Sequence, residues 1–88
     1  MTYAVTFSHQ ARRALTHDLP EPVAAACFEF IAGPLADDPH RVGKPLRAPL
    51  DGLWSARRGE FRVLFEIHEH RVLVHVVTIR HRRDAYRA

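Results

Sequence analysis

Two arginines on either side of a predicted β-turn, Arg57 and Arg62, are the first candidates for chemistry in this sequence. The turn is Gly59-Glu60, and a two-residue connection that begins with Gly is typical of a type II′ hairpin, because Gly adopts positive φ without steric cost. This register predicts that Arg57 lies directly opposite Arg62, with Cβ atoms about 5 Å apart. Like charges in that position destabilise a sheet, whereas two planar guanidinium groups held side by side suit a phosphate. Either the pair binds an anion, or the side chains extend into water, or the register shifts by one residue.

The hairpin separates these two arginines from the predicted core, because side chains alternate between the two faces of a strand. The face expected to be mostly apolar and to join the core consists of Trp54, Ala56, Arg58, Phe61, Val63 and Phe65. The opposite face consists of Ser55, Arg57, Arg62 and Leu64. The sequence therefore predicts a basic site on the sheet face that is turned away from the core.

Two helices are expected to cover the core face. Residues 1–8 alternate as a strand does, and Ser8 is a suitable N-cap for a helix that begins at His9. A proline turn at residues 20–22 ends this helix and starts a second one, which buries Cys27 as a small core residue and weakens or ends at Gly33-Pro34. Residues 36–52 contain three prolines and two glycines, so we expect a loop without regular structure there.

The fold class follows from the order of the predicted elements. After the hairpin and a polar turn at residues 68–71, the apolar run 72–79 is expected to be the central strand, and a basic tail follows it. The order is then β-α-α-β-β-β. We predict a single α+β domain over residues 1–88, with a mostly antiparallel four-stranded sheet and both N-terminal helices packed on one face.

Charge and composition narrow the functional classes. Residues 1–40 carry two arginines against five acidic residues, a net charge of −3, whereas residues 41–88 carry eleven Lys or Arg against five acidic residues, a net charge of +6. This asymmetry indicates either a polyanionic partner, of which nucleic acid is the commonest, or a solvated basic surface. The single cysteine excludes an internal disulfide and a thiolate metal cluster. Since neither a signal peptide nor a bilayer-spanning apolar run is recognised, a cytoplasmic protein without a membrane partner is expected.

Three runs of the sequence resemble a known family: residues 43–47, residues 50–67 and residues 79–87. They are similar to the RelE toxins of the bacterial RelE/ParE superfamily, and the N-terminal strand and helix pair also fit. The most specific parts are the arginine-glycine-x-aromatic-arginine turn at residues 58–62 and the histidine-arginine…tyrosine pattern at residues 81–86. The resemblance implies a small toxin that is paired with a RelB-like antitoxin, enters the ribosomal A site and cuts the exposed mRNA. Operator DNA would be contacted only through the antitoxin.

The resemblance also implies roles for individual residues. Family members use an arginine that matches Arg62, another that matches Arg82, and a terminal tyrosine that matches Tyr86. The two lysines that the best-studied members carry before the hairpin turn fall on Ser55 and Arg57, so one basic group is missing here and the other is an arginine. Some relatives place a histidine near the C-terminal end, where this chain has His81.

The implied reaction is attack of a ribose 2′-OH on the adjacent 3′-phosphate with expulsion of the 5′-oxygen. RNA carries its own nucleophile, so no metal and no cofactor is expected. Charge stabilisation falls to Arg57, Arg62 and Arg82. His81 and Tyr86 are the candidates for proton transfer, unless His81 only caps the strand end and Tyr86 packs on the hairpin or stacks on a base. Contacts to ribosomal RNA phosphates are expected from Lys44, Arg47, Arg58 and Arg83.

Two other functions remain open from the sequence. The leading alternative is a ParE-like DNA gyrase inhibitor, a binding toxin of the same superfamily without nuclease activity. The other is a non-catalytic RNA-binding module. The facing pair Arg57 and Arg62, together with His81 and Tyr86, favours the nuclease.

Overall fold

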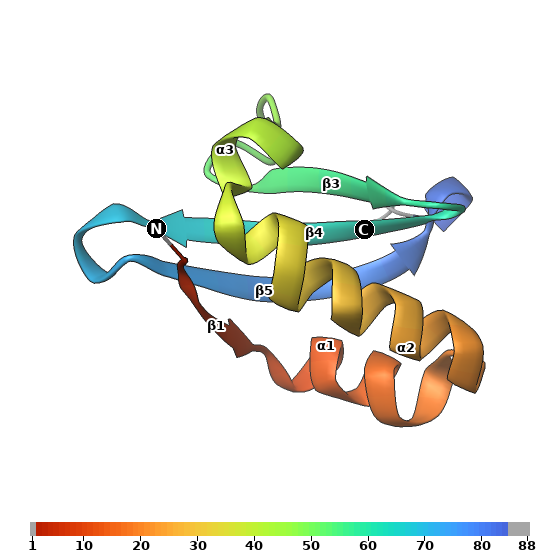
Figure 1. The fold of residues 1–88 in the computed structure, drawn as a ribbon. Coiled ribbons are helices and arrows are strands. Elements are labelled where there is room, and N and C mark those ends of the chain that lie inside the picture. Colours follow the sequence, from red (N-terminus) through yellow and green to blue (C-terminus); the bar gives the residue numbers. More distant parts are fainter. Residues whose placement is uncertain (1, 85–88) are drawn as a thin grey trace.

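The computed structural model describes residues 2–84, and a five-stranded sheet forms its centre. The strands are β1 (Ala4–Phe7), β2 (Lys44–Pro45), β3 (Trp54–Arg58), β4 (Phe61–His68) and β5 (Leu73–His81), in the spatial order β1-β5-β4-β3-β2. The helices are α1 (His9–Arg13), α2 (Glu21–Phe30) and α3 (Pro39–Val42). In Figure 1, α2 crosses one face of the sheet, with α1 beside it and α3 near the start of β3. The predicted α+β class is confirmed.

The hairpin between β3 and β4 has the predicted register. Arg57 pairs with Arg62 and Trp54 pairs with Phe65. Gly59 has a φ of 59°, as the first position of a type II′ turn requires. The predicted core face is also confirmed, since Ala56, Val63 and Phe65 are buried.

The prediction of four strands is wrong, because the sheet has a fifth strand and is mixed. β1 pairs in parallel with β5, while β2 pairs antiparallel with β3 through Lys44 opposite Ser55. β2 and α3 both lie in the segment that was expected to be an irregular loop. β2 forms in spite of Pro45 because it is an edge strand, where a residue without an N–H costs no interior ladder bond.

The predicted N-cap is confirmed, whereas the end of the second helix lies further along the chain than expected. Ser8 Oγ accepts a hydrogen bond of 3.0 Å from the backbone N–H of Ala11. Helical structure passes Gly33-Pro34 as a π-helical segment at Ile31–Leu35. Such wider turns accommodate a proline, whose ring and missing N–H disrupt regular α-helical bonding. The fully buried Leu35 shows what the extension contributes, because burying such a side chain stabilises by roughly 1.5–3 kcal/mol.

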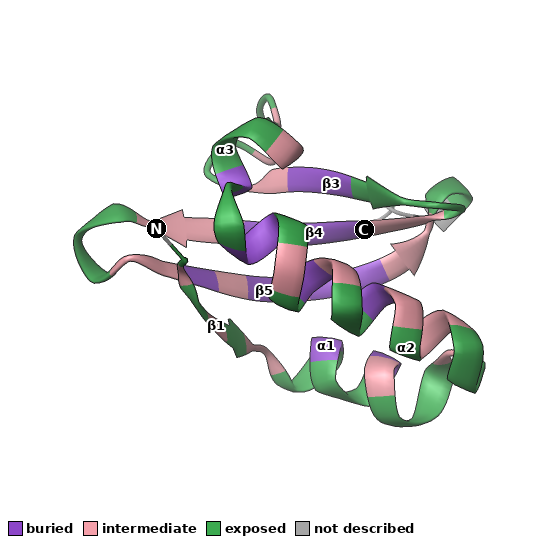
Figure 2. Cartoon of the chain, in the orientation of Figure 1, coloured by how far each residue is buried: buried purple, intermediate pink, exposed green. Residues whose placement is uncertain are grey.

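The core lies between the sheet and α1 and α2 (Figure 2). From the sheet it contains Val63, Phe65, Val74 and Val76, and from the helical segments Ala11, Ala14, Cys27, Ile31 and Leu35. Cys27 is only 1% exposed, which confirms its prediction as a core residue. Burial raises the pKa of the Cys27 thiol, although the charge of Arg58 opposes this shift. None of the helices in residues 2–84 is long and apolar enough to cross a membrane.

Two glycines test how closely the segment before β2 packs on the core. A Cβ on Gly43 would lie 2.6 Å from Cζ of the buried Phe65 and 3.1 Å from the carbonyl oxygen of Pro39, whereas a Cβ on Gly33 would meet no atom within 4 Å. We expect Gly43→Ala to lower the free energy of unfolding by about 1–3 kcal/mol through overpacking. The control Gly33→Ala should raise it by about 0.4–1 kcal/mol, because it restricts the unfolded chain. Urea denaturation of both variants measures the difference, and equal effects would contradict the packing described here.

Candidate functional site

Three arginines stand in a row across the middle of the sheet, on the face opposite the helices. Arg57 of β3 pairs with Arg62 of β4, and Arg62 pairs in turn with Arg80 of β5. We call these three residues the arginine row. Because neighbouring strands are about 4.8 Å apart, the three side chains start within about 10 Å of one another. The predicted facing pair is therefore part of a larger cationic cluster.

Hydrogen bonds to neighbouring residues orient the arginine row. Nε of Arg57 donates to the carbonyl oxygen of Gly59 at 3.4 Å, and Nε of Arg80 donates to Oγ1 of Thr78 at 3.3 Å. Nε of Arg62 is buried. Each guanidinium is thus held at its base, on strands and not on a loop, which favours a fixed geometry toward a ligand.

Arg80 was not among the residues predicted from the sequence, and a β-bulge explains why. Leu64 pairs with Thr78 while the next residue, Phe65, pairs with Val76, so Val77 is inserted between the two pairs. One inserted residue reverses the faces of all that follow it. Counting from the polar turn without the bulge puts Arg80 on the helix face, whereas the real register puts it beside Arg62.

The same bulge places His81 away from the arginine row. His81 pairs with Phe61, and the two rings meet edge to face at 5.4 Å between centroids. Its Nδ1 accepts a hydrogen bond of 3.3 Å from the backbone N–H of Arg83, so in the neutral ring the proton is on Nε2. Nε2 lies 3.8 Å from Oε2 of Glu60. The expected grouping of His81 with Arg57 and Arg62 is therefore not what the described structure brings together.

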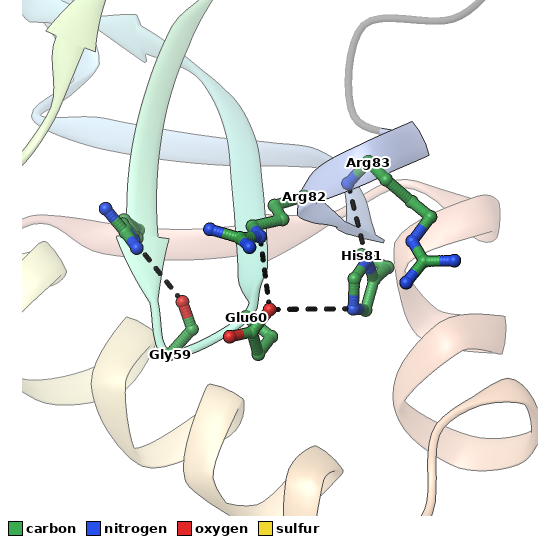
Figure 3. A network of polar contacts seen from close by, with 6 residues as sticks. Gly59, Glu60, His81, Arg82 and Arg83 are labelled. Atoms are coloured by element: carbon green, nitrogen blue, oxygen red, sulfur yellow. Dashed lines mark hydrogen bonds and ion pairs between the residues drawn. The ribbon is translucent and has the colours of Figure 1, made fainter.

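Arg82 lies at the end of the arginine row and is bound to Glu60 (Figure 3). Its backbone N–H donates to the carbonyl oxygen of Glu60 at 2.7 Å, which extends the β4–β5 ladder by one bond. Its Nε lies 3.1 Å from Oε2 of the same residue. Glu60 was missed by the sequence analysis, which treated it only as a turn residue. Its position next to Gly59 gave no sign of a contact with residues more than twenty positions later.

The four predicted RNA-contact residues are distributed over different parts of the surface. Lys44 is exposed and opposite Ser55, so it shares the face of the arginine row. Arg47 and Arg83 are exposed, in the turn after β2 and in the 3-10 turn after β5 respectively. Arg58 is on the helix side, where it lines a groove of about 290 Å³ with the first turns of α2 and Phe61. Tyr86 lies outside the described residues.

The described part of the site supplies positive charge. The arginine row, Arg82 and Lys44 offer planar or point-charge donors suited to phosphate oxygens and to the extra negative charge of a phosphorane. Among residues 2–84 no three His, Cys, Asp or Glu side chains are grouped so as to hold a metal ion. The arrangement therefore fits the binding of a phosphodiester by cations alone.

Comparison with known proteins agrees with this site and fold. A family model described as the ParE toxin of the type II toxin–antitoxin system parDE matches residues 5–86. Toxin RelE of Mycobacterium tuberculosis (strain ATCC 25618 / H37Rv) is 48% identical over 85 residues, which are 97% of this chain and 87% of the relative. Toxin RelG of the same strain is 47% identical over 87 residues, 99% of each chain.

Solved structures give the same result. The toxin–antitoxin complex RelBE2 of Mycobacterium tuberculosis matches with a TM-score of 0.89 and 45% identity, covering 96% of this chain and 95% of that chain. The RelE–RelB complex of Pyrococcus horikoshii OT3 matches with a TM-score of 0.65 and 25% identity over the full length of both chains. These findings confirm the resemblance read from the sequence. The chain belongs to the ParE toxin family of type II toxin–antitoxin systems, within the RelE/ParE superfamily.

Proposed function

We propose that this chain is the toxin of a RelBE-type pair and inhibits translation as a ribosome-dependent mRNA endoribonuclease in the cytoplasm. The observation that carries this proposal is the arginine row, in which Arg57, Arg62 and Arg80 are aligned on one sheet face. Three like charges in register weaken a sheet, so their alignment calls for an anionic ligand. The 47–48% identity to proteins named Toxin RelE and Toxin RelG supports the same reading.

The chemistry follows from the charge of the site. The 2′-oxygen of an mRNA ribose attacks the adjacent phosphorus, its proton passes to a base, and the bond to the 5′-oxygen breaks as that oxygen takes up a proton. The products are a 2′,3′-cyclic phosphate and a free 5′-hydroxyl. Arg57 and Arg62 bind the non-bridging oxygens, whose negative charge grows in the transition state, and Arg82 assists from the end of the row.

The ribosome contributes what the site lacks. An arginine-rich site without an evident base among residues 2–84 depends on the placement of the substrate, and correct placement can lower a barrier by several kcal/mol. Lys44, Arg47 and Arg83 are exposed and suited to ribosomal RNA phosphates. Arg58 would make such a contact from the opposite side of the hairpin.

We also propose a cognate RelB-like antitoxin as partner. Support comes from the similar solved structures, which are toxin–antitoxin complexes. The net charge of +6 in residues 41–88 suits an acidic antitoxin segment that folds as it binds.

The family description favours one other function, because it names ParE toxins. A gyrase inhibitor would share the fold but would not need the arginine row on the sheet. Expression of the chain in cells, followed by mapping of new mRNA 5′ ends, separates the two functions. We expect cuts inside translated codons, whereas DNA damage with intact mRNA would establish gyrase inhibition instead.

Arg62→Ala is expected to abolish cleavage without harming the fold. The change relieves repulsion from both neighbours in the row, worth roughly 0.2–1 kcal/mol per cross-strand pair, and loses some packing of the arginine stem. The free energy of unfolding should therefore stay within about 1 kcal/mol of wild type. Cleavage should fall by about 10²–10³, the size seen when one preorganised donor to a developing oxyanion is removed.

Arg71→Ala is the matched control for Arg62→Ala, because Arg71 is an exposed arginine in the turn at the opposite end of β4. It removes the same charge and should leave cleavage unchanged. Melting curves and single-turnover cleavage on programmed ribosomes are measured on one preparation of each variant. A melting temperature of Arg62→Ala well below wild type would mean that the residue is structural.

Tyr86→Phe and His81→Gln test the two proton-transfer candidates. If the Tyr86 hydroxyl transfers a proton, Tyr86→Phe should slow single-turnover cleavage on ribosomes by about 10²-fold or more. We expect a smaller effect of His81→Gln, because His81 lies on the Phe61 side of the hairpin. Unchanged rates in both variants would remove both residues from proton transfer.

A further inference from the structure

Glu60 brings the one acidic side chain known to contact the cationic cluster within residues 2–84. Its carboxylate oxygen Oε2 lies 3.1 Å from Nε of Arg82 and 3.8 Å from Nε2 of His81. Figure 3 shows the carboxylate between these two side chains, at the tip of the hairpin. A backbone hydrogen bond of 2.7 Å from Arg82 to Glu60 fixes the two residues side by side without using either side chain.

The contact is placed where an RNA phosphate would have to bind. Arg82 follows Arg80 by two residues at the end of the arginine row, and a carboxylate presents oxygens to a guanidinium much as a phosphate does. The side chains are 53% exposed for Arg82 and 60% exposed for Glu60. An ion pair this exposed is weak and easily exchanged. A phosphodiester can therefore replace the carboxylate.

We propose that Glu60 is the internal counter-anion of the site: it holds Arg82 at the end of the arginine row in the free protein and is replaced there by an RNA phosphate. Glu60 is thus a positioning residue that acts through Arg82. This inference rests on the proposed function and adds to it a residue that sets how strongly the site attracts RNA. A substrate must reach several cations at once to displace the carboxylate, so a continuous polynucleotide is favoured over an isolated phosphate.

Glu60→Gln tests the proposal, because it removes the charge and leaves the turn and the backbone bond in place. The probe is a single-stranded DNA oligonucleotide, which offers phosphates but no 2′-OH and so cannot be cut by the proposed reaction. Its affinity, measured by fluorescence anisotropy at low salt, should rise about three- to tenfold, the effect of removing one like charge beside a phosphate at the solvent-exposed surface. The slope of log K against log salt should steepen by roughly 0.7, as one more phosphate is neutralised.

Two variants serve as controls. Glu66→Gln changes the net charge equally, but Glu66 pairs with His68 and lies six residues along β4, about 20 Å from Glu60 and beyond the screening length at 0.1 M salt. It should leave the affinity unchanged. Glu60→Asp keeps the negative charge and should bind within about twofold of wild type.

The outcomes separate this inference from the proposed function. Equal affinities of Glu60→Gln and Glu66→Gln, or weaker binding by Glu60→Gln, would overturn the counter-anion role. Cleavage on ribosomes by Glu60→Gln should stay within about threefold of wild type, and a loss near 10²-fold would overturn the proposal by making Glu60 a proton-transfer residue. Arg62→Ala reports on the site itself: if it binds the oligonucleotide as wild type does, the arginine row is not the nucleic-acid site and the proposed function fails.

Discussion

The site depends on one inserted residue, Val77, because the bulge that it forms decides which side chains of β5 share a face with Arg62. The bulge is tied to the N-terminal helices by Ser8. The Ser8 hydroxyl donates to the carbonyl oxygen of Val77 at 2.5 Å and accepts from the backbone N–H of Ala11 at 3.0 Å. The side chain that caps α1 thus also binds the unpaired residue of the sheet. Loss of this link would affect helix packing and the alignment of the arginine row together.

The arginine row sets local stability against function. Three guanidinium groups in register repel one another, and water and salt screen that repulsion only in part. The opposite face compensates, because there the sheet packs Val63, Phe65 and their neighbours on the helices without polar interruption. The two faces therefore have separate tasks: one provides the burial that stabilises the domain, and the other holds a charge arrangement that would be unfavourable without a ligand. Such a division is common where a site must be prepared for its substrate in advance.

Local chemistry was predictable from the sequence, whereas pairing between distant segments was not. The Gly59 turn fixed the register of β3 and β4, so the Arg57–Arg62 pair followed from residues less than ten positions apart. The bulge arises from the packing of β5 against β1 and β4, and no local signal marks Val77. The same reason hid Arg80 and Glu60, whose partners are set by that register. Pro34 and Pro45 were given too much weight as breakers, since a π-helical segment and an edge position accommodate them.

The tip of the hairpin joins these features into one device. Gly59 supplies the positive φ that closes the turn and the carbonyl oxygen that Arg57 binds, while its neighbour Glu60 binds Arg82. Two adjacent turn residues therefore orient cations at both ends of the arginine row. Because a two-residue turn has little freedom, both contacts are fixed once β3 and β4 pair. The geometry that attracts RNA is in this way a consequence of hairpin formation, and it does not require the ligand to assemble it.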